Sequence, residues 1–186
     1  MQTQVVGYDP TMVDTTPGAG TPSEELREED GVMCTPDGLK YLTPTRARAF
    51  LGLVRTGDRL ARDLSATLER SHGISLHAFE VLLHLAVFSG DGQRRMADLI
   101  EQTPLSQSRV SRLVADLERH GLVERSQLDA DRREVVVTIT PAGVELFRQA
   151  QETHLADLEA RFFCRLSPEE LRQLTELTNR IFDPRG

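Results

Sequence analysis

The stretch Pro104–Arg125 constrains the fold most, because its apolar residues keep a regular helical spacing. They recur at i, i+3, i+4 and i+7, which is one face of a helix. These residues are Val110, Leu113, Val114 and Leu117. Ser106 is expected to accept a hydrogen bond from the amides of the first turn, and Gly121 can take the left-handed conformation that ends a helix. The pattern predicts a helix from about Gln107 to His120.

The opposite face of this helix carries short polar side chains and arginines, with no carboxylate before Asp116. Its residues are Gln107, Ser108, Arg109, Ser111, Arg112 and Ala115. Serine, glutamine and arginine are the side chains that donate hydrogen bonds to phosphates and base edges. The composition of this face therefore favours a polar, anionic partner.

A hairpin is predicted directly after the helix. Leu122–Ser126 and Glu134–Thr140 are strand-like, the second being rich in valine and isoleucine. The Asp/Arg run between them is expected to form the turn, with Arg132 and Arg133 near its tip. Helix, glycine, strand, arginine-bearing turn and strand is the order of a winged helix-turn-helix, in which the helix enters a major groove and the wing reaches a minor groove.

The residues of this region also resemble a known family. The run DADRREVVVTITPAG (Asp129–Gly143), preceded by LSQSRVSRLVADLERHGLVER, is similar to the MarR family of bacterial transcriptional regulators, and the likeness covers roughly residues 43–183. The resemblance implies a mainly α-helical fold with a small β-hairpin wing, flanked by long N- and C-terminal dimerisation helices. It also implies a homodimer on a pseudo-palindromic double-stranded DNA operator, acting as a repressor and released by a small-molecule effector.

The resemblance and the chemistry of the side chains together give candidate DNA-binding residues. On the recognition helix they are Ser106, Gln107, Ser108, Arg109, Ser111 and Arg112, and on the wing Asp131, Arg132 and Arg133, with Asp129 beside them. Glutamine pairs with adenine and arginine with guanine, and Arg112 is our choice for the strongest base contact. We expect Arg133 to neutralise Asp131 while Arg132 points outward.

Capping signals place the remaining helices. Thr43-Pro44, Ser75, Thr140-Pro141 and Ser167-Pro168 each begin a helix, and the last forms a capping box with Glu170. The predicted helices cover residues 44–71, 76–88, 96–101, 107–120, 141–165 and 168–183, with a turn at Ser89–Gly92. We expect a winged helix-turn-helix at 74–140 and a helical dimerisation region at 43–73 and 141–183.

The acidic charge of the chain is concentrated at its N-terminus. The formal net charge is −7, yet residues 1–40 hold eight acidic and two basic residues and account for −6 of it. DNA attraction then depends on local arginines, namely Arg109, Arg112, Arg125, Arg132 and Arg133. The Pro-, Gly- and Thr-rich residues 1–42 read as a flexible arm, or as a segment that packs on the dimer or modulates DNA access.

Other sequence features limit the remaining functions. No apolar run approaches the twenty residues of a membrane span, and a secretory signal is not expected. Two cysteines, Cys34 and Cys164, fit a reducing cytoplasm better than a disulfide scaffold. Cofactor-binding and catalytic motifs are absent from the sequence, so an enzyme is not expected, and His154 and Asp157 read as a solvated helix face.

Three alternatives stay open at this point. Cys34 precedes the first helix, where some members of the resembled family sense oxidants, so a cysteine-based redox regulator is one. A stripe of His77, Glu80 and His84 could bind a metal, although hydrogen bonds to helix neighbours are the simpler reading and no metal is expected. A winged-helix protein-interaction module without DNA binding is the third. Polar positions on apolar helices suggest the effector cleft: Arg55, Arg59, His77 and His84.

Overall fold

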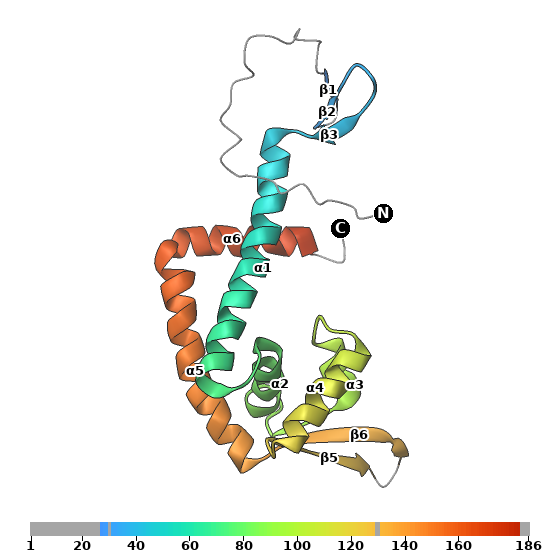
Figure 1. Cartoon of the computed structure of the whole chain (residues 1–186), viewed down its shortest axis with the longest axis vertical. Helices are drawn as coiled ribbons and strands as arrows, with labels where there is room; N and C mark the ends of the chain where they lie inside the picture. The colour runs from blue at the N-terminus through green and yellow to red at the C-terminus, as the bar shows by residue number, and fades with distance from the viewer. Residues whose placement is uncertain (1–26, 30, 129–130, 183–186) are drawn as a thin grey trace. The chain divides into compact units, whose positions relative to one another are not determined.

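The computed structural model describes residues 27–29, 31–128 and 131–182, and it divides the chain into two compact units, Met1–Arg55 and Thr56–Gly186. The prediction of a mainly α-helical fold with a β wing is confirmed (Figure 1). Among the described residues, none of the helices combines the length and the apolar character that crossing a membrane requires.

The first unit contains a small antiparallel sheet that composition did not predict. Its strands are β1 (Arg27–Glu29), β2 (Val32–Cys34) and β3 (Lys40–Leu42), in the order β1-β2-β3. Gly31 turns the chain between the first two strands with a φ of +77°, and the Arg46 guanidinium occupies the space that a Cβ there would need. Composition gave no sign of this sheet, because strands this short show no alternating pattern, and the role of the arm stays a prediction.

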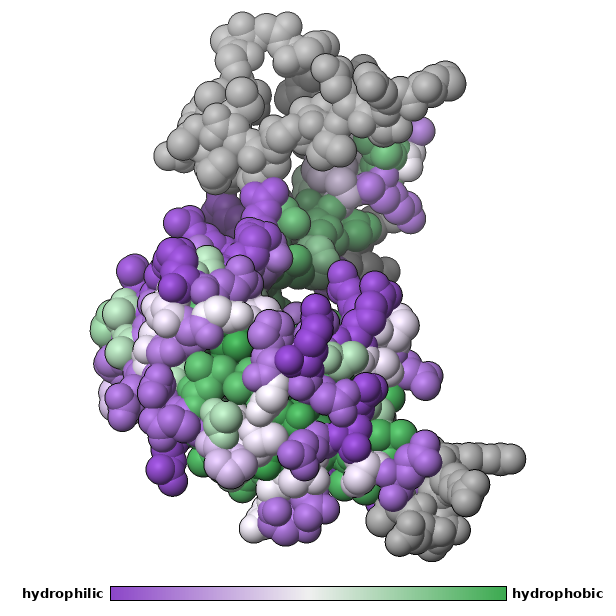
Figure 2. All heavy atoms as spheres, turned by 60° about the horizontal axis from the view of Figure 1, so that its bottom comes forward, coloured by the Kyte–Doolittle hydropathy of each residue, from purple (hydrophilic) through white to green (hydrophobic). Residues whose placement is uncertain are grey.

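Helix α1 (Pro44–His72) begins and ends close to the predicted residues. The Thr43 carbonyl oxygen accepts a hydrogen bond from the Ala47 N–H at 2.9 Å, and Gly73 follows the helix with a φ of +71°. Its buried residues are Leu64 and Leu68, in its second half. In the first half, Phe50, Leu53 and Val54 are exposed. The face of the molecule drawn in Figure 2 shows apolar patches among hydrophilic side chains.

Helix α2 (Leu76–Ala86) is the centre of the core. The Ser75 hydroxyl accepts a hydrogen bond from the Ala78 N–H at 3.2 Å, so the predicted cap is confirmed, although the helix ends two residues before the predicted Phe88. Apolar side chains from α2, the next two helices, the wing and the following helix bury one another. Those that are almost fully buried include Phe79, Leu82, Leu85, Leu99, Val110, Val114 and Val137.

The helix-turn-helix consists of α3 (Met96–Glu101) and α4 (Gln107–Arg119), as predicted. A strand that we did not predict, β4 (Gln93–Arg95), precedes α3 and pairs with β6 (Asp131–Ile139), which also pairs with β5 (Val123–Leu128). The sequence QRR shows no alternation, so this strand arises from pairing with β6. The wing is thus a three-stranded sheet in the order β4-β6-β5.

Two helices complete the second unit, α5 (Pro141–Arg161) and α6 (Pro168–Phe182). Thr140 caps α5 by accepting a hydrogen bond from the Gly143 N–H at 3.0 Å. The helix ends before the predicted Arg165, and a single 3₁₀ turn over Phe163–Arg165 follows. The capping box of α6 is confirmed, since the Ser167 N–H donates to Glu170 Oε2 at 2.8 Å and the Glu170 N–H to Ser167 Oγ at 3.3 Å.

Candidate nucleic-acid interface

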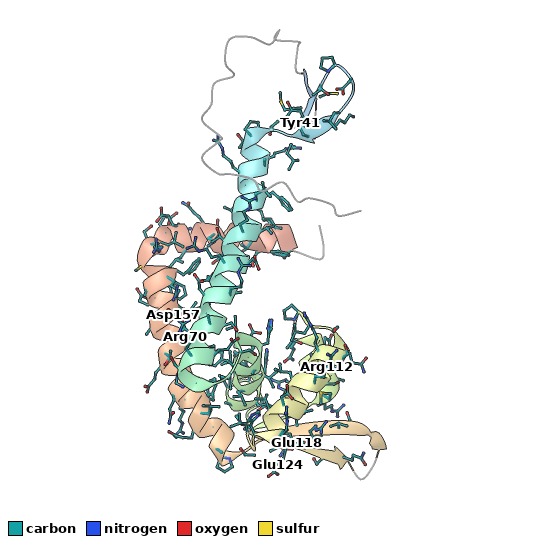
Figure 3. The ribbon with its side chains drawn as sticks, in the orientation of Figure 1. Tyr41, Arg70, Arg112, Glu118, Glu124 and Asp157 are labelled. Carbon is teal, nitrogen blue, oxygen red and sulfur yellow. The ribbon has the colours of Figure 1, made fainter. Side chains whose placement is uncertain are left out.

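The two faces of α4 differ sharply in burial. Val110 and Val114 are fully buried and Leu117 is nearly so, which fixes this side of the helix against the core. The other side carries the six candidate residues, of which only Ser111 is half-buried and the others are exposed. Arg112 is exposed on α4, where Figure 3 labels it, and its Nε donates a hydrogen bond to the Ser108 carbonyl at 3.2 Å. A polar face remains open for a partner.

The start of α4 differs from the prediction in one respect. Ser106 stands at the N-cap with extended dihedral angles, but its side chain makes no capping hydrogen bond. Its hydroxyl lies 3.3 Å from the Ser108 hydroxyl instead, and its carbonyl accepts from the Arg109 N–H at 2.8 Å. The predicted side-chain cap is therefore wrong, and the Ser106 hydroxyl satisfies none of the amides of the first turn.

A groove of about 350 Å³ runs beside the recognition helix. It combines apolar and charged side chains from the start of α2 and from α4, and it is lined by Ser75, His77, Leu105, Arg109, Arg112, Leu113 and Asp116. His77 Nδ1 lies 3.0 Å from Glu80 Oε2. The two candidate base-reading arginines thus stand over a concave surface with a histidine on its far side.

The candidate effector residues occupy different environments. Arg55 lies in the first unit, and Arg59 lies 3.8 Å from Asp63. His77 lines the groove beside α4, whereas the His84 ring stacks obliquely on Phe88 with 5.5 Å between ring centroids. Nδ1 of His84 is buried and has no hydrogen-bond partner among the described residues. Among the residues that the structure describes, no group of three or more His, Cys, Asp or Glu side chains is placed to hold a metal ion.

The wing residues lie on a strand where a turn was expected. Asp131, Arg132 and Arg133 belong to β6, and Asp131 pairs with Leu128 of β5 after a register shift. The prediction of a turn over these residues is wrong, because backbone pairing continues through a segment whose composition favours a turn. Asp129 lies outside the described residues, and so do the side chains on which the predicted contact between Asp131 and Arg133 depends.

Arg125, counted above among the local arginines, is paired with a residue that sequence reasoning missed. Its side chain donates to Glu118 at the end of α4, and this hydrogen bond lowers the pKa of the Glu118 carboxyl. The two residues lie seven positions apart, on either side of Gly121. The sequence did hold a signal for this pair. Glu118 lies three residues before the glycine that ends the helix, and Arg125 lies four residues after it.

The remaining sequence candidates are the two cysteines and the pair of His154 and Asp157. Cys34 is half-buried on β2, with Sγ 3.6 Å from the Thr35 carbonyl, and Cys164 is exposed. His154 and Asp157 are both partly buried, and burial lowers the pKa of the His154 imidazole. The reading of this pair as a solvated face is therefore wrong, because that side of α5 packs against α2.

A helix-turn-helix followed by a β wing defines the chain as a winged helix-turn-helix protein. A profile of the MarR family matches residues 72–134. Sco3205, a MarR family transcriptional regulator from Streptomyces coelicolor in complex with DNA, has 27% identity, covers 78% of this chain and 90% of its own, and superposes with a TM-score of 0.72. The chain is thus similar, in fold and over residues 72–134 in sequence, to MarR family transcriptional regulators.

Two other relatives extend the comparison. The HTH-type transcriptional regulator YfiV from Bacillus subtilis (strain 168) is 34% identical over 92 residues. The matched stretch covers 50% of this chain and 57% of the length of that relative. BpsR from Bordetella bronchiseptica, whose DNA binding is regulated by 6-hydroxynicotinic acid, has 25% identity, covers 72% of this chain and 98% of its own, with a TM-score of 0.62.

Proposed function

We propose that this chain binds double-stranded DNA sequence-specifically, as a homodimer that represses transcription. The observation that carries the proposal is the exposed face of α4, which has two arginines, a glutamine and serines and no acid before Asp116, while its opposite face is buried. A helix held in this way presents its polar face to a major groove.

The candidate residues would have distinct roles. Gln107 pairs with adenine and Arg109 and Arg112 with guanine, since their side chains can make bidentate contacts to these bases. Ser108 and Ser111 reach bases or phosphates, and Ser106 lies beside them at the start of α4. Arg132 enters the minor groove from the wing, while Arg133 neutralises Asp131 and holds the loop.

The homodimer would form through the long terminal helices. Leu177 and Ile181 on α6 are 47% and 61% exposed, and apolar residues at this helical spacing are expected to be covered by another helix. Two-fold symmetry would place two copies of α4 in successive major grooves, roughly 34–36 Å apart. The operator is then a pseudo-palindrome.

Selection of bound sites from random DNA tests the proposal. We expect enrichment of one pseudo-palindrome, and a log–log dependence of its affinity on salt with a slope of about −0.9 for each phosphate contacted. If the protein failed to bind DNA at any salt concentration, or bound it without sequence preference, sequence-specific binding would be contradicted. Absence of any DNA binding would support the protein-interaction module in its place.

A small molecule would regulate this binding. The support is BpsR, a relative whose DNA binding responds to 6-hydroxynicotinic acid. A ligand that binds one spacing of the two recognition helices better than another shifts the DNA affinity of the dimer. The candidate contacts remain Arg55, Arg59, His77 and His84. Release of the selected operator by 6-hydroxynicotinic acid, and its loss on His77→Gln, would support this part, and an unchanged affinity would exclude this ligand.

Redox regulation through Cys34 is tested with the same operator. We expect hydrogen peroxide to leave the affinity unchanged, since the Cys34 thiol is only partly exposed and oxidation requires access to the sulfur. A peroxide response that Cys34→Ser abolishes would establish the redox alternative.

A further inference from the structure

One carboxylate holds both the side chain and the main chain of Arg125. Oε2 of Glu118, in the last turn of α4, accepts hydrogen bonds from Nε of Arg125 at 2.8 Å and from its Nη2. Oε1 of the same carboxylate accepts from the Arg125 backbone N–H at 3.2 Å. Figure 3 places Glu118 where α4 meets β5. Glu118 thus joins the recognition helix directly to the wing.

The backbone contact satisfies a group at the edge of the sheet. β5 is an edge strand in the order β4-β6-β5, and Arg125 faces Val137 of β6. An edge strand leaves alternate N–H groups without a strand partner. The Arg125 N–H is one of these, and Glu118 accepts its hydrogen bond, so the first half of β5 is held from both sides.

The chain between the two residues is also fixed. Gly121 has a φ of +71°, and its N–H donates to the Glu118 carbonyl at 2.9 Å, while the Leu122 N–H donates to the Leu117 carbonyl at 2.9 Å. This pair of hydrogen bonds is a Schellman motif, which sets the direction in which the chain leaves a helix. The carboxylate contact adds a second restraint on the same turn.

We propose that Glu118 and Arg125 are positioning residues that set the orientation of the wing relative to the recognition helix, and that Arg125 does not itself contact DNA. The inference rests on the proposed function. Because the Arg125 guanidinium already donates twice to a carboxylate, its charge is largely neutralised and it offers little to a phosphate. Glu118 then contributes to DNA binding through geometry and in spite of its negative charge.

The sign of the Glu118→Gln effect separates geometry from charge. Removing an acid near DNA strengthens binding if only long-range attraction matters. We expect roughly tenfold weaker binding to the selected operator, since a contact between paired residues is lost. Glu124→Gln is the matched control, because it removes the same charge from the neighbouring position of β5. Unchanged or tighter binding by Glu118→Gln would overturn the proposal.

Glu118→Asp keeps the charge and shortens the side chain by one methylene. Weaker binding by this variant, with thermal unfolding like that of the wild type, supports positioning, and wild-type affinity would contradict it. A cycle with Arg125→Gln provides the second test. If Arg125 acts through Glu118, the double variant binds no more weakly than either single variant. If the losses of affinity in the two single variants multiply in the double variant, Arg125 contacts DNA directly. The same conclusion would follow if Arg125→Gln reduced the salt dependence of the affinity by about one phosphate contact.

Footprinting shows which part of the interface moves. We expect Glu118→Gln to weaken hydroxyl-radical protection of the minor groove under the wing, while guanine N7 in the major groove stays protected from methylation. Equal loss of both protections would overturn the positioning role. If the wild-type chain shows no salt-dependent DNA binding, the proposed function fails. If it binds and the cycle is additive, only this inference fails.

Discussion

The imidazole of His154 on α5 packs against the phenyl ring of Phe79 on α2, with 4.6 Å between the ring centroids. Nδ1 of His154 and Oδ2 of Asp157 are buried and have no hydrogen-bond partner among the described residues. Burial lowers the pKa of His154, and the nearby carboxylates of Asp157 and Glu80 only partly oppose this effect. The neutral imidazole is therefore part of the contact between these two helices.

Acid is expected to weaken this contact. The pKa of His154 in the folded chain lies below its ordinary value of 6.5, so the unfolded chain binds more protons as the pH falls through 6.5. Stability should then fall with decreasing pH, by no more than about 1.4 kcal/mol per pH unit for one proton. Denaturant unfolding between pH 7.5 and 5 measures it. His154→Gln should make the free energy of unfolding less dependent on pH, whereas His120→Gln, an exposed control, should leave the dependence unchanged. Identical pH dependences for the wild type and His154→Gln would refute this prediction.

Gly143 lies where the start of α5 approaches the chain leading into β5. A Cβ at this position would overlap the carbonyl oxygen of Leu122 and lie 2.9 Å from Ile139 Cγ1. Leu122 is held in place because its carbonyl accepts a hydrogen bond from the Thr140 N–H at 3.0 Å. We expect Gly143→Ala to lower the free energy of unfolding by about 3 kcal/mol, measured by denaturant titration.

The matched control for Gly143 is Gly57, which lies in α1 with open space around its missing Cβ. An alanine there should stabilise the helix by about 0.5–1 kcal/mol, because glycine loses more backbone freedom on folding. Equal effects of the two substitutions would show that the close approach at Gly143 is not what matters.

Arg112→Ala should weaken binding to the selected operator by about 1–3 kcal/mol and relax the preference at one base pair. The physical reason is that the substitution would remove the proposed bidentate contact to guanine from an exposed position on α4. Competition binding with single-base operator variants measures both effects. Arg119→Ala is the control, since Arg119 pairs with Asp116 on the same helix. Equal losses on operator and scrambled DNA would reduce Arg112 to a phosphate contact.

Placing a charge on α6 should separate the proposed homodimer. Leu177→Asp and Ile181→Asp would bury a carboxylate in the interface, which is unfavourable without a partner. Sedimentation should show monomers, and operator affinity should fall by at least about a hundredfold because the two halves no longer bind together. Glu176→Gln, an exposed neighbour, should leave both unchanged. A wild-type chain that sediments as a monomer would remove the basis for the pseudo-palindrome.

The sequence was informative where periodicity and capping agree. The spacing of Val110 and Val114 and the glycine at 121 identified α4 within one residue, and Ser167 with Glu170 identified the start of α6. The missed strands, β4 and β1–β3, are three residues long and depend on partners distant from any local pattern. The same reason explains Glu118, since its role requires the arrangement of α4 against β5. The sequence could not predict the burial of His154 either, because it does not reveal which side of α5 packs against α2.

The central position of β6 has a consequence for control of the protein. β6 pairs on one side with β4, which leads into α3, and on the other with β5, which follows α4. A single strand, β6, therefore connects the wing and the helix-turn-helix through backbone pairing on both of its edges. Under the proposed function, an effector would therefore act on the distance between two such units in the dimer and not on the shape of one of them.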